Sequence, residues 1–162
     1  MISFDLSSFL PYRLAVLSER ISKCLSLEYA RSHGISVAEW RVLVHLAHGR
    51  EVSVRDIHNC VNLEKPRVSR AVTGLEKAGL ARKGTSKADS RLVAISLTEQ
   101  GRAVLGEILP SALEFEAKLL DALSAQELER FYEIAEKLHA VLDNDPTAPR
   151  RSVMDRSATR SA

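Results

Sequence analysis

The feature that most constrains this chain is the uneven distribution of charge along it. Between positions 65 and 91 there are eight basic and two acidic residues, so this segment carries +6 in a chain whose total is +2. Everything outside it therefore sums to −4. Concentration of one sign of charge on one short unit is typical of a surface that binds nucleic acid. The bases are Lys65, Arg67, Arg70, Lys77, Arg82, Lys83, Lys87 and Arg91, and the acids are Glu76 and Asp89.

The residues around this segment predict two short helices joined by a tight turn. Ser53, in the pattern Ser-x-x-Asp, can cap a helix that runs to Val61. After a turn at 62–64, Pro66 marks the first turn of a second helix that ends at Gly79. The second helix has a basic and polar face opposite an apolar stripe, which indicates a helix-turn-helix. That stripe consists of Val68, Ala71, Val72 and Leu75.

Two strands are expected directly after the basic helix, at 80–83 and 92–97. The residues between them, 84–90, form a polar Gly- and Ser-containing loop, so the three pieces predict a hairpin. A hairpin in this place is the wing of a winged helix-turn-helix, expected over about 36–97. The predicted fold class is mainly α with a small β-wing, with further helices at both ends of the chain.

The flanking helices are acidic and amphipathic. Residues 98–142 hold nine acids and four bases, a net charge of −5, so this end is not expected to face nucleic acid. The apolar stripes of the terminal helices are too few to enclose a core alone, and pairing with a second copy of the chain would bury them. The helices are expected at about 11–31, at 36–49, at 98–123 with Pro110 inside, and at 124–142 behind a capping box at Ser124 and Glu127.

The predicted organisation is one domain over 1–142 and a tail over 143–162. The tail is rich in Pro, Ser and Arg and cannot bury enough apolar surface to fold, so it is expected to be disordered and basic. No apolar run reaches the roughly 18 residues that a membrane span needs, and the first residues lack the pattern of a secretory signal. With only two cysteines, a cytoplasmic location without membrane contact is expected.

Catalytic and metal-binding patterns are not found in the sequence. The five histidines show no metal-ligand spacing, and neither HExxH, CxxC, a P-loop nor GxSxG occurs. We therefore expect no enzyme activity, no metal and no cofactor.

Taken in order, these segments resemble the MarR family of bacterial transcriptional regulators, over roughly 10–142. The resemblance implies an obligate homodimer with dimerisation helices at about 11–31 and 98–142. It also implies two winged lobes on a pseudo-palindromic double-stranded DNA operator, and in most cases repression relieved by a small ligand or by oxidation. The matching segments are Ala38-Glu39-Trp40-Arg41-Val42-Leu43, Val54-Arg55-Asp56-Ile57, 63–72, Leu75-Glu76-Lys77-Ala78-Gly79-Leu80, Asp89-Ser90-Arg91 and 97–102.

Several side chains are expected to contact DNA. The first turns of a recognition helix meet base edges in the major groove, and arginine can bind guanine with two hydrogen bonds. The residues expected there are Lys65, Arg67, Ser69, Arg70 and Thr73. Arg82, Lys83 and Lys87 are expected to meet phosphates. Ser53 and Arg55 could hold phosphates at a helix start, although Ser53 as a plain cap explains the pattern equally. The resemblance implies that Arg91, fixed by Asp89, enters the minor groove; the alternative is an exposed surface pair.

The resemblance also suggests where a signal is received. An arginine near the start of the first helix, here Arg13, can meet the carboxylate of an aromatic acid, so the ligand is expected to be such an acid or its thioester; a solvent-exposed arginine or a subunit salt bridge is the alternative. Trp40 either lines the same cleft or packs in the core. Cys24 in the first helix is either a peroxide sensor or a small buried apolar residue. A winged-helix module that binds protein and has no specific DNA site also remains open.

Overall fold

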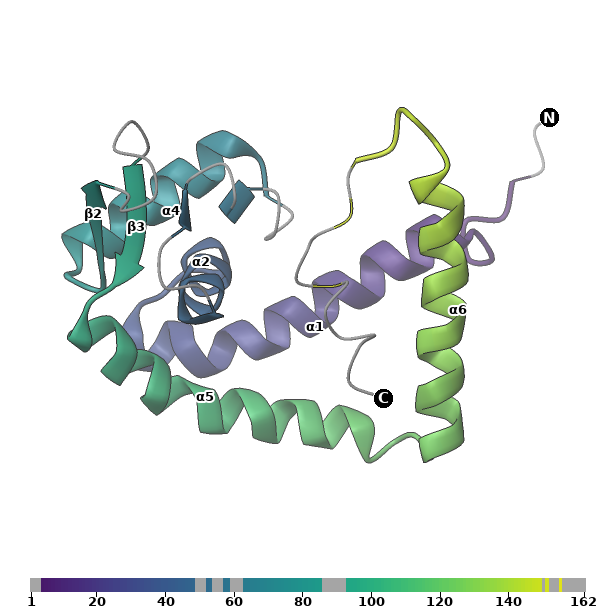
Figure 1. The fold of residues 1–162 in the computed structure, drawn as a ribbon. Coiled ribbons are helices and arrows are strands. Elements are labelled where there is room, and N and C mark those ends of the chain that lie inside the picture. Colours follow the sequence, from purple (N-terminus) through teal and green to yellow (C-terminus); the bar gives the residue numbers. More distant parts are fainter. Residues whose placement is uncertain are drawn as a thin grey trace.

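The computed structural model describes residues 4–48, 52–53, 57–58, 63–85, 93–149, 151 and 155. Figure 1 shows a lobe at one end, from which two long helices lead to a third at the far end. The lobe contains α2, α4 and the sheet; α1 and α5 are the long helices, and α6 lies at the far end. The helices are α1 (Leu10–His33), α2 (Val37–His48), α4 (Lys65–Lys77), α5 (Glu99–Leu120) and α6 (Ala125–Asp143), and the strands are β1 (Val52–Ser53), β2 (Ala81–Thr85) and β3 (Val93–Leu97).

The helices begin and end where their terminal residues predict. Gly34 follows α1 with a φ of 64°, a left-handed conformation that glycine adopts without strain. Thr98 caps α5 by accepting a hydrogen bond from the Gly101 N–H at 2.9 Å. Ser124 and Glu127 form the predicted capping box in front of α6. The predicted mainly α fold with a small β-wing is confirmed, with helix ends shifted by one to three residues.

The sheet has one more strand than the sequence predicts. Its order is β1-β3-β2, antiparallel throughout. The additional strand, β1, pairs Ser53 with Ala94. A strand of two residues has no alternation for the sequence to display, which is why only the helix cap was predicted at Ser53. Ile57 and His58 are helical as expected, whereas the remainder of that predicted short helix lies outside the described residues.

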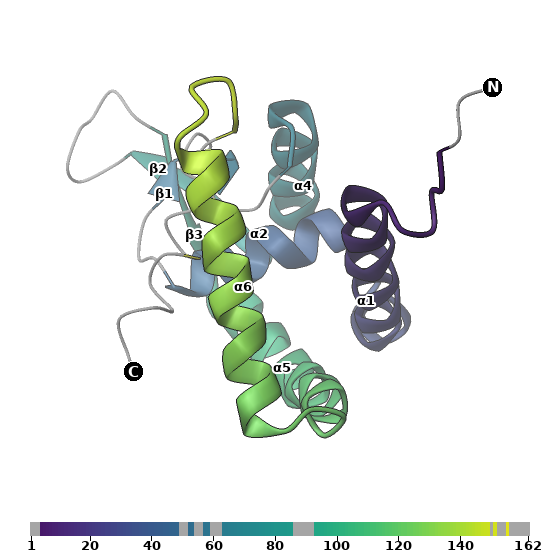
Figure 2. The same ribbon diagram turned by 90° about the vertical axis from the view of Figure 1, so that its right-hand side faces the viewer.

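The apolar core lies inside the lobe and includes one end of each long helix. The predicted stripe of α4 is buried in full, with exposed fractions between 0 and 4%. It packs on α2 and on the sheet, and Tyr29 of α1 and Ile108 of α5 complete the same cluster. By contrast, α6 has no buried residue. Figure 1 shows α6 apart from the lobe; in Figure 2, turned by 90°, α6 is in front and is seen along its length.

The residues after α6 make a contact that the predicted tail does not include. Arg151 pairs with the Glu136 carboxylate on α6 and donates from Nε to Asp155 Oδ2 at 2.7 Å. Its side chain is only 9% exposed. One guanidinium that binds two carboxylates can hold a polar residue against a helix without an apolar anchor. The disorder expected for the rest of 143–162 stays a prediction.

Candidate nucleic-acid interface

The side chains predicted to meet bases lie together on the solvent face of α4. Because Val68, Ala71, Val72 and Leu75 anchor one side of this helix in the core, the opposite side has to face outward. Local hydrogen bonds hold two of the outward groups: Arg70 Nε donates to Pro66 O at 3.2 Å, and Thr73 Oγ1 donates to Ser69 O at 2.9 Å. All five predicted residues, Lys65, Arg67, Ser69, Arg70 and Thr73, are exposed.

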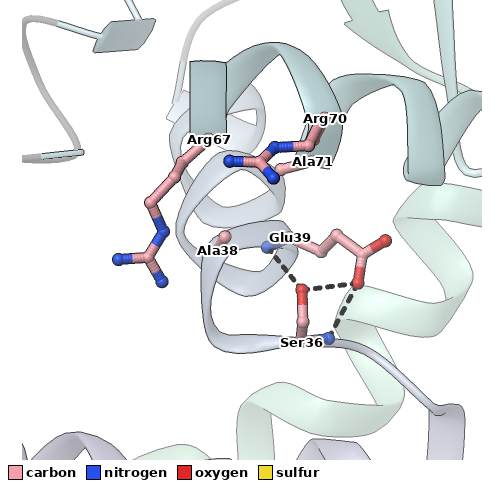
Figure 3. A pocket seen from close by; sticks show the side chains of 6 residues that line it. All are labelled: Ser36, Ala38, Glu39, Arg67, Arg70 and Ala71. Carbon is pink, nitrogen blue, oxygen red and sulfur yellow. Dashed lines mark hydrogen bonds between the residues drawn. The ribbon is translucent and has the colours of Figure 1, made fainter. Parts of the chain in front are cut away.

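A cavity of about 260 Å³ lies beside this face, between the first turns of α4 and the start of α2. Figure 3 shows Arg67 and Arg70 extending over it from α4. On its floor the Glu39 carboxylate accepts hydrogen bonds from Ser36 N at 2.8 Å and Ser36 Oγ at 2.7 Å. Glu39 is therefore held in the capping box of α2, together with Ser36. The guanidinium groups of Arg67 and Arg70 lie at the rim of the cavity.

Gly74 lies where the recognition helix meets the Glu39 side chain of α2, and it was not among the residues predicted for the site. A Cβ at this position would lie 2.2 Å from Glu39 Oε1, so the end of the Glu39 side chain would have to move. A glycine in the interior of a helix is destabilising unless packing requires it. That rule is the signal in the sequence that could have identified Gly74.

The two basic residues at the start of the wing point to opposite faces of the sheet. Arg82 pairs with Ser96 across the sheet and donates from Nε to its Oγ at 3.3 Å. Lys83 pairs with the fully buried Ile95, and its Nζ lies 2.6 Å from Glu76 Oε2 at the end of α4. Both were expected to meet phosphates, which stays a prediction, and in the free chain Lys83 has a carboxylate partner.

Several of the predicted DNA contacts cannot be placed. Arg55, Lys87, Asp89 and Arg91 lie outside the described residues. Ser53 is described, in β1 and half-buried.

The residues predicted for ligand binding do not meet within one chain. Trp40 is 9% exposed and stacks on Tyr29, with ring centroids 5.0 Å apart and planes at 15°. Burial raises the pKa of Tyr29, and Arg41 partly opposes this. Arg13 is exposed and lies sixteen residues before Tyr29 on α1, which corresponds to about 24 Å along the helix. Within the chain Trp40 therefore packs in the core, and a site containing both Arg13 and Trp40 would need a second subunit.

Cys24 is exposed on α1. In a single chain it does not act as the small buried apolar residue that was one of its two expected roles. Within the described ranges, no three or more His, Cys, Asp or Glu side chains gather as metal ligands. None of the helices in that part of the chain is long and apolar enough to cross a membrane.

The fold and the basic face of α4 define a winged helix-turn-helix protein, and comparisons with known proteins identify its family. Residues 33–92 match the MarR family model. An HTH-type transcriptional regulator of Bacillus cereus is 31% identical over 119 residues, covering 73% of this chain and 79% of the relative.

Solved structures agree with these sequence matches. A MarR/EmrR family transcriptional regulator from Acinetobacter sp. ADP1 superposes with a TM-score of 0.80 at 26% identity, covering 88% of this chain and all of that one. A MarR family transcriptional regulator from Silicibacter pomeroyi DSS-3 has a TM-score of 0.72 at 30% identity, over 86% and 99% of the two chains. The chain belongs to the MarR family of transcriptional regulators.

Proposed function

We propose that this regulator is a homodimeric, sequence-specific DNA-binding repressor that a small ligand releases from its operator. The observation that carries the proposal is the face of α4, where five polar and basic side chains stand opposite a fully buried apolar stripe. A structural neighbour from Streptomyces coelicolor, with a TM-score of 0.76 at 21% identity, is a MarR family regulator in complex with DNA. Because its target is DNA, we expect the protein to act in the cytoplasm.

The proposed contacts are of two kinds, those to base edges and those to the DNA backbone. Arg67 and Arg70 are proposed to bind base edges in the major groove, with Lys65, Ser69 and Thr73 beside them. Arg82, Lys87, Ser53 and Arg55 are proposed to hold phosphates, which adds affinity without sequence information. Arg91, oriented by Asp89, is proposed to enter the minor groove, whose negative potential attracts arginine. Lys83 is left out of this set because its ammonium is paired with Glu76.

The dimer is proposed from the uncovered apolar side chains of the terminal helices. Each lobe then reads one half-site, and half-sites about one helical turn (~34 Å) apart require a fixed distance between the lobes. A ligand acts by binding better to a dimer whose lobe spacing does not fit the operator. The apolar residues proposed to meet the second copy are Leu10, Leu14, Leu17, Leu113, Phe131, Ile134, Leu138, Val141 and Leu142.

The proposed ligand is an aromatic carboxylate or its thioester, bound by Arg13 of one chain near the dimer contact. A structural neighbour, BpsR of Bordetella bronchiseptica, has its DNA binding regulated by 6-hydroxynicotinic acid. The exposed thiol of Cys24 favours a second candidate signal, oxidation by peroxide. A thermal-shift screen of aromatic acids, acyl-CoA thioesters and peroxide, with Arg13→Ala and Cys24→Ser alongside the parent, separates the two, because a ligand that binds the native state raises Tm.

Arg70→Ala tests the DNA-binding proposal. The operator is first selected from random duplexes, and its affinity is then measured by fluorescence anisotropy. Loss of a bidentate contact to guanine is expected to weaken binding by about 1–3 kcal/mol, roughly five- to 150-fold, and to relax the preference at one base position.

Arg130→Ala is the matched control, since it removes the same charge from α6, where Arg130 pairs with Glu133 at 2.7 Å. It should leave operator affinity unchanged. If the selection enriches no palindrome, or if Arg70→Ala binds as tightly as the parent, the protein is a winged-helix module of another kind and the proposal is wrong.

A further inference from the structure

The contact between the recognition helix and the wing points to a role for Glu76, which pairs with Lys83. Cross-strand partners in an antiparallel pair point to the same face of the sheet. Lys83 shares its face with Ile95, and two pairs further along Ala81 shares the same face with Leu97. These three partners are 0 to 4% exposed, so this face packs on the helices. Lys83 therefore leaves the core side of the sheet and reaches the end of α4, away from Arg82.

Glu76 stands on the same side of α4 as two residues proposed to face the major groove. Ser69, Thr73 and Glu76 are spaced four and three residues apart, so they follow one another along one edge of the helix. The Glu76 carboxylate thus lies one turn beyond Thr73, at the border between the proposed DNA face and the wing. Its side chain is 27% exposed, against 43% for Lys83.

An unpaired carboxylate in this place would repel the phosphates of a bound duplex, and Lys83 neutralises it. The pair is worth little by itself, because half-exposed ion pairs contribute about 0–1 kcal/mol. A phosphate could therefore compete for Lys83, but the exchange would leave Glu76 uncompensated beside the negative DNA backbone. This opposing cost favours the pair over a Lys83–phosphate contact.

We propose that Glu76 limits the affinity of the protein for DNA of any sequence, because by pairing with Lys83 it keeps that ammonium from the DNA phosphates. This inference rests on the proposed function, since it concerns how the same surface divides its charge. Sequence-independent affinity depends on how many phosphates are neutralised, because each neutralised phosphate releases counterions. Withholding one lysine in each lobe lowers that affinity and leaves the base contacts of α4 unchanged.

The test measures binding to a duplex of arbitrary sequence, about 30 base pairs long so that both lobes can bind. Anisotropy titrations run from about 50 to about 200 mM KCl, and the slope of log affinity against log salt counts the phosphates neutralised. For Glu76→Gln we expect the slope to steepen by about 0.9 for each lobe in contact. Over this fourfold range of salt, that is an extra loss of roughly 3.5-fold per lobe.

Two further variants make the result specific. The double variant Glu76→Gln with Lys83→Gln exchanges a neutral pair for a neutral pair, so its slope should equal that of the parent. Glu114→Gln is the matched control, because it removes a carboxylate from another lysine pair, with Lys118 at 2.9 Å on α5. It changes the net charge equally and should leave the slope unchanged.

Three results would show that Glu76 does not keep Lys83 from the phosphates. A slope that stays at the parent value in Glu76→Gln overturns it, and so does a slope that falls by about 0.9 per lobe in the double variant, since Lys83 would then be a phosphate contact. If Glu114→Gln steepens the slope as much as Glu76→Gln, the effect belongs to net charge alone and the inference is wrong. A parent that does not bind the duplex even at low salt removes the proposed function together with the inference.

Discussion

Val42 and Val141 lie on the apolar stripes of two helices, yet Val42 in α2 is 0% exposed and Val141 in α6 is 68% exposed. The same contrast separates Leu43, at 0%, from Leu142, at 52%. An apolar stripe on a helix indicates that a face will be buried but not what will bury it. In the lobe, the apolar stripes are buried by the same chain, because α2, α4 and the sheet cover one another.

The terminal helices keep apolar side chains exposed to solvent, so the two regions are expected to be stabilised in different ways. Along α6, Phe131, Ile134, Leu138 and Val141 follow helical spacing and are 38 to 68% exposed. An isolated helix of 19 residues is marginal in water unless its apolar face is covered. A cover supplied by a second copy would make the stability of this region depend on protein concentration, whereas the lobe needs no partner to close its core.

The largest expected effect is on the terminal helices, in Leu138→Glu. A carboxylate in the centre of the proposed contact would be buried twice in a symmetric dimer, so we expect the dimer dissociation constant to rise about a hundredfold or more. Sedimentation equilibrium over a range of concentrations measures the change. Gln126→Glu, which adds the same charge at an exposed position of α6, should leave the dimer intact. A parent protein that sediments as a monomer at micromolar concentration would show that no second copy covers α6.

The next effect is on the lobe, in Gly101→Ala. A Cβ at Gly101 would lie 2.0 Å from Leu80 O, a backbone atom that cannot move aside cheaply. The same junction holds the hydrogen bond from Thr98 Oγ1 to Gly79 O at 2.6 Å, so the end of α4 and the start of α5 shift together. We expect a loss of about 2 kcal/mol in the free energy of unfolding, measured by denaturant titration at fixed protein concentration.

Gly106→Ala is the control within the same helix. No atom lies within 4 Å of a Cβ at Gly106, so this variant should be neutral or more stable by up to about 1 kcal/mol, as helix propensity predicts. Equal losses in the two variants would mean that the close contact at Leu80 does not restrain the lobe.

The sequence could predict those features that depend on residues close together in the chain. The capping pairs at Ser36 and Ser124, the stop at Gly34 and the buried stripe of α4 depend on residues close in the chain, so spacing alone identifies them. The basic face of α4 follows directly, because a helix with one side buried exposes the other.

What the sequence could not predict depends on residues brought together by the fold. The pairing of Lys83 with Glu76 requires the sheet register, which decides to which face each residue of β2 points. The approach of Glu39 to Gly74 requires the packing of α4 on α2. The contact of Arg151 with Glu136 involves no apolar residues, so no hydrophobic pattern in the sequence could have predicted it.

The smallest change in stability is expected at the start of α6, in Glu127→Gln. The pKa of Glu127 is held below its ordinary value because the backbone N–H and the hydroxyl of Ser124 both donate to the carboxylate. A carboxyl with a lowered folded-state pKa stabilises the fold above its ordinary value of 4.5, and this contribution is lost as the pH falls through the lowered pKa. Glu127→Gln should therefore be less stable than the parent at pH 7 and approach it at low pH, in thermal unfolding followed by circular dichroism. Glu129→Gln, two residues further along the same exposed turn, serves as control. A gap between parent and Glu127→Gln that persists undiminished below the lowered pKa would show that the charge of Glu127 plays no part in the cap.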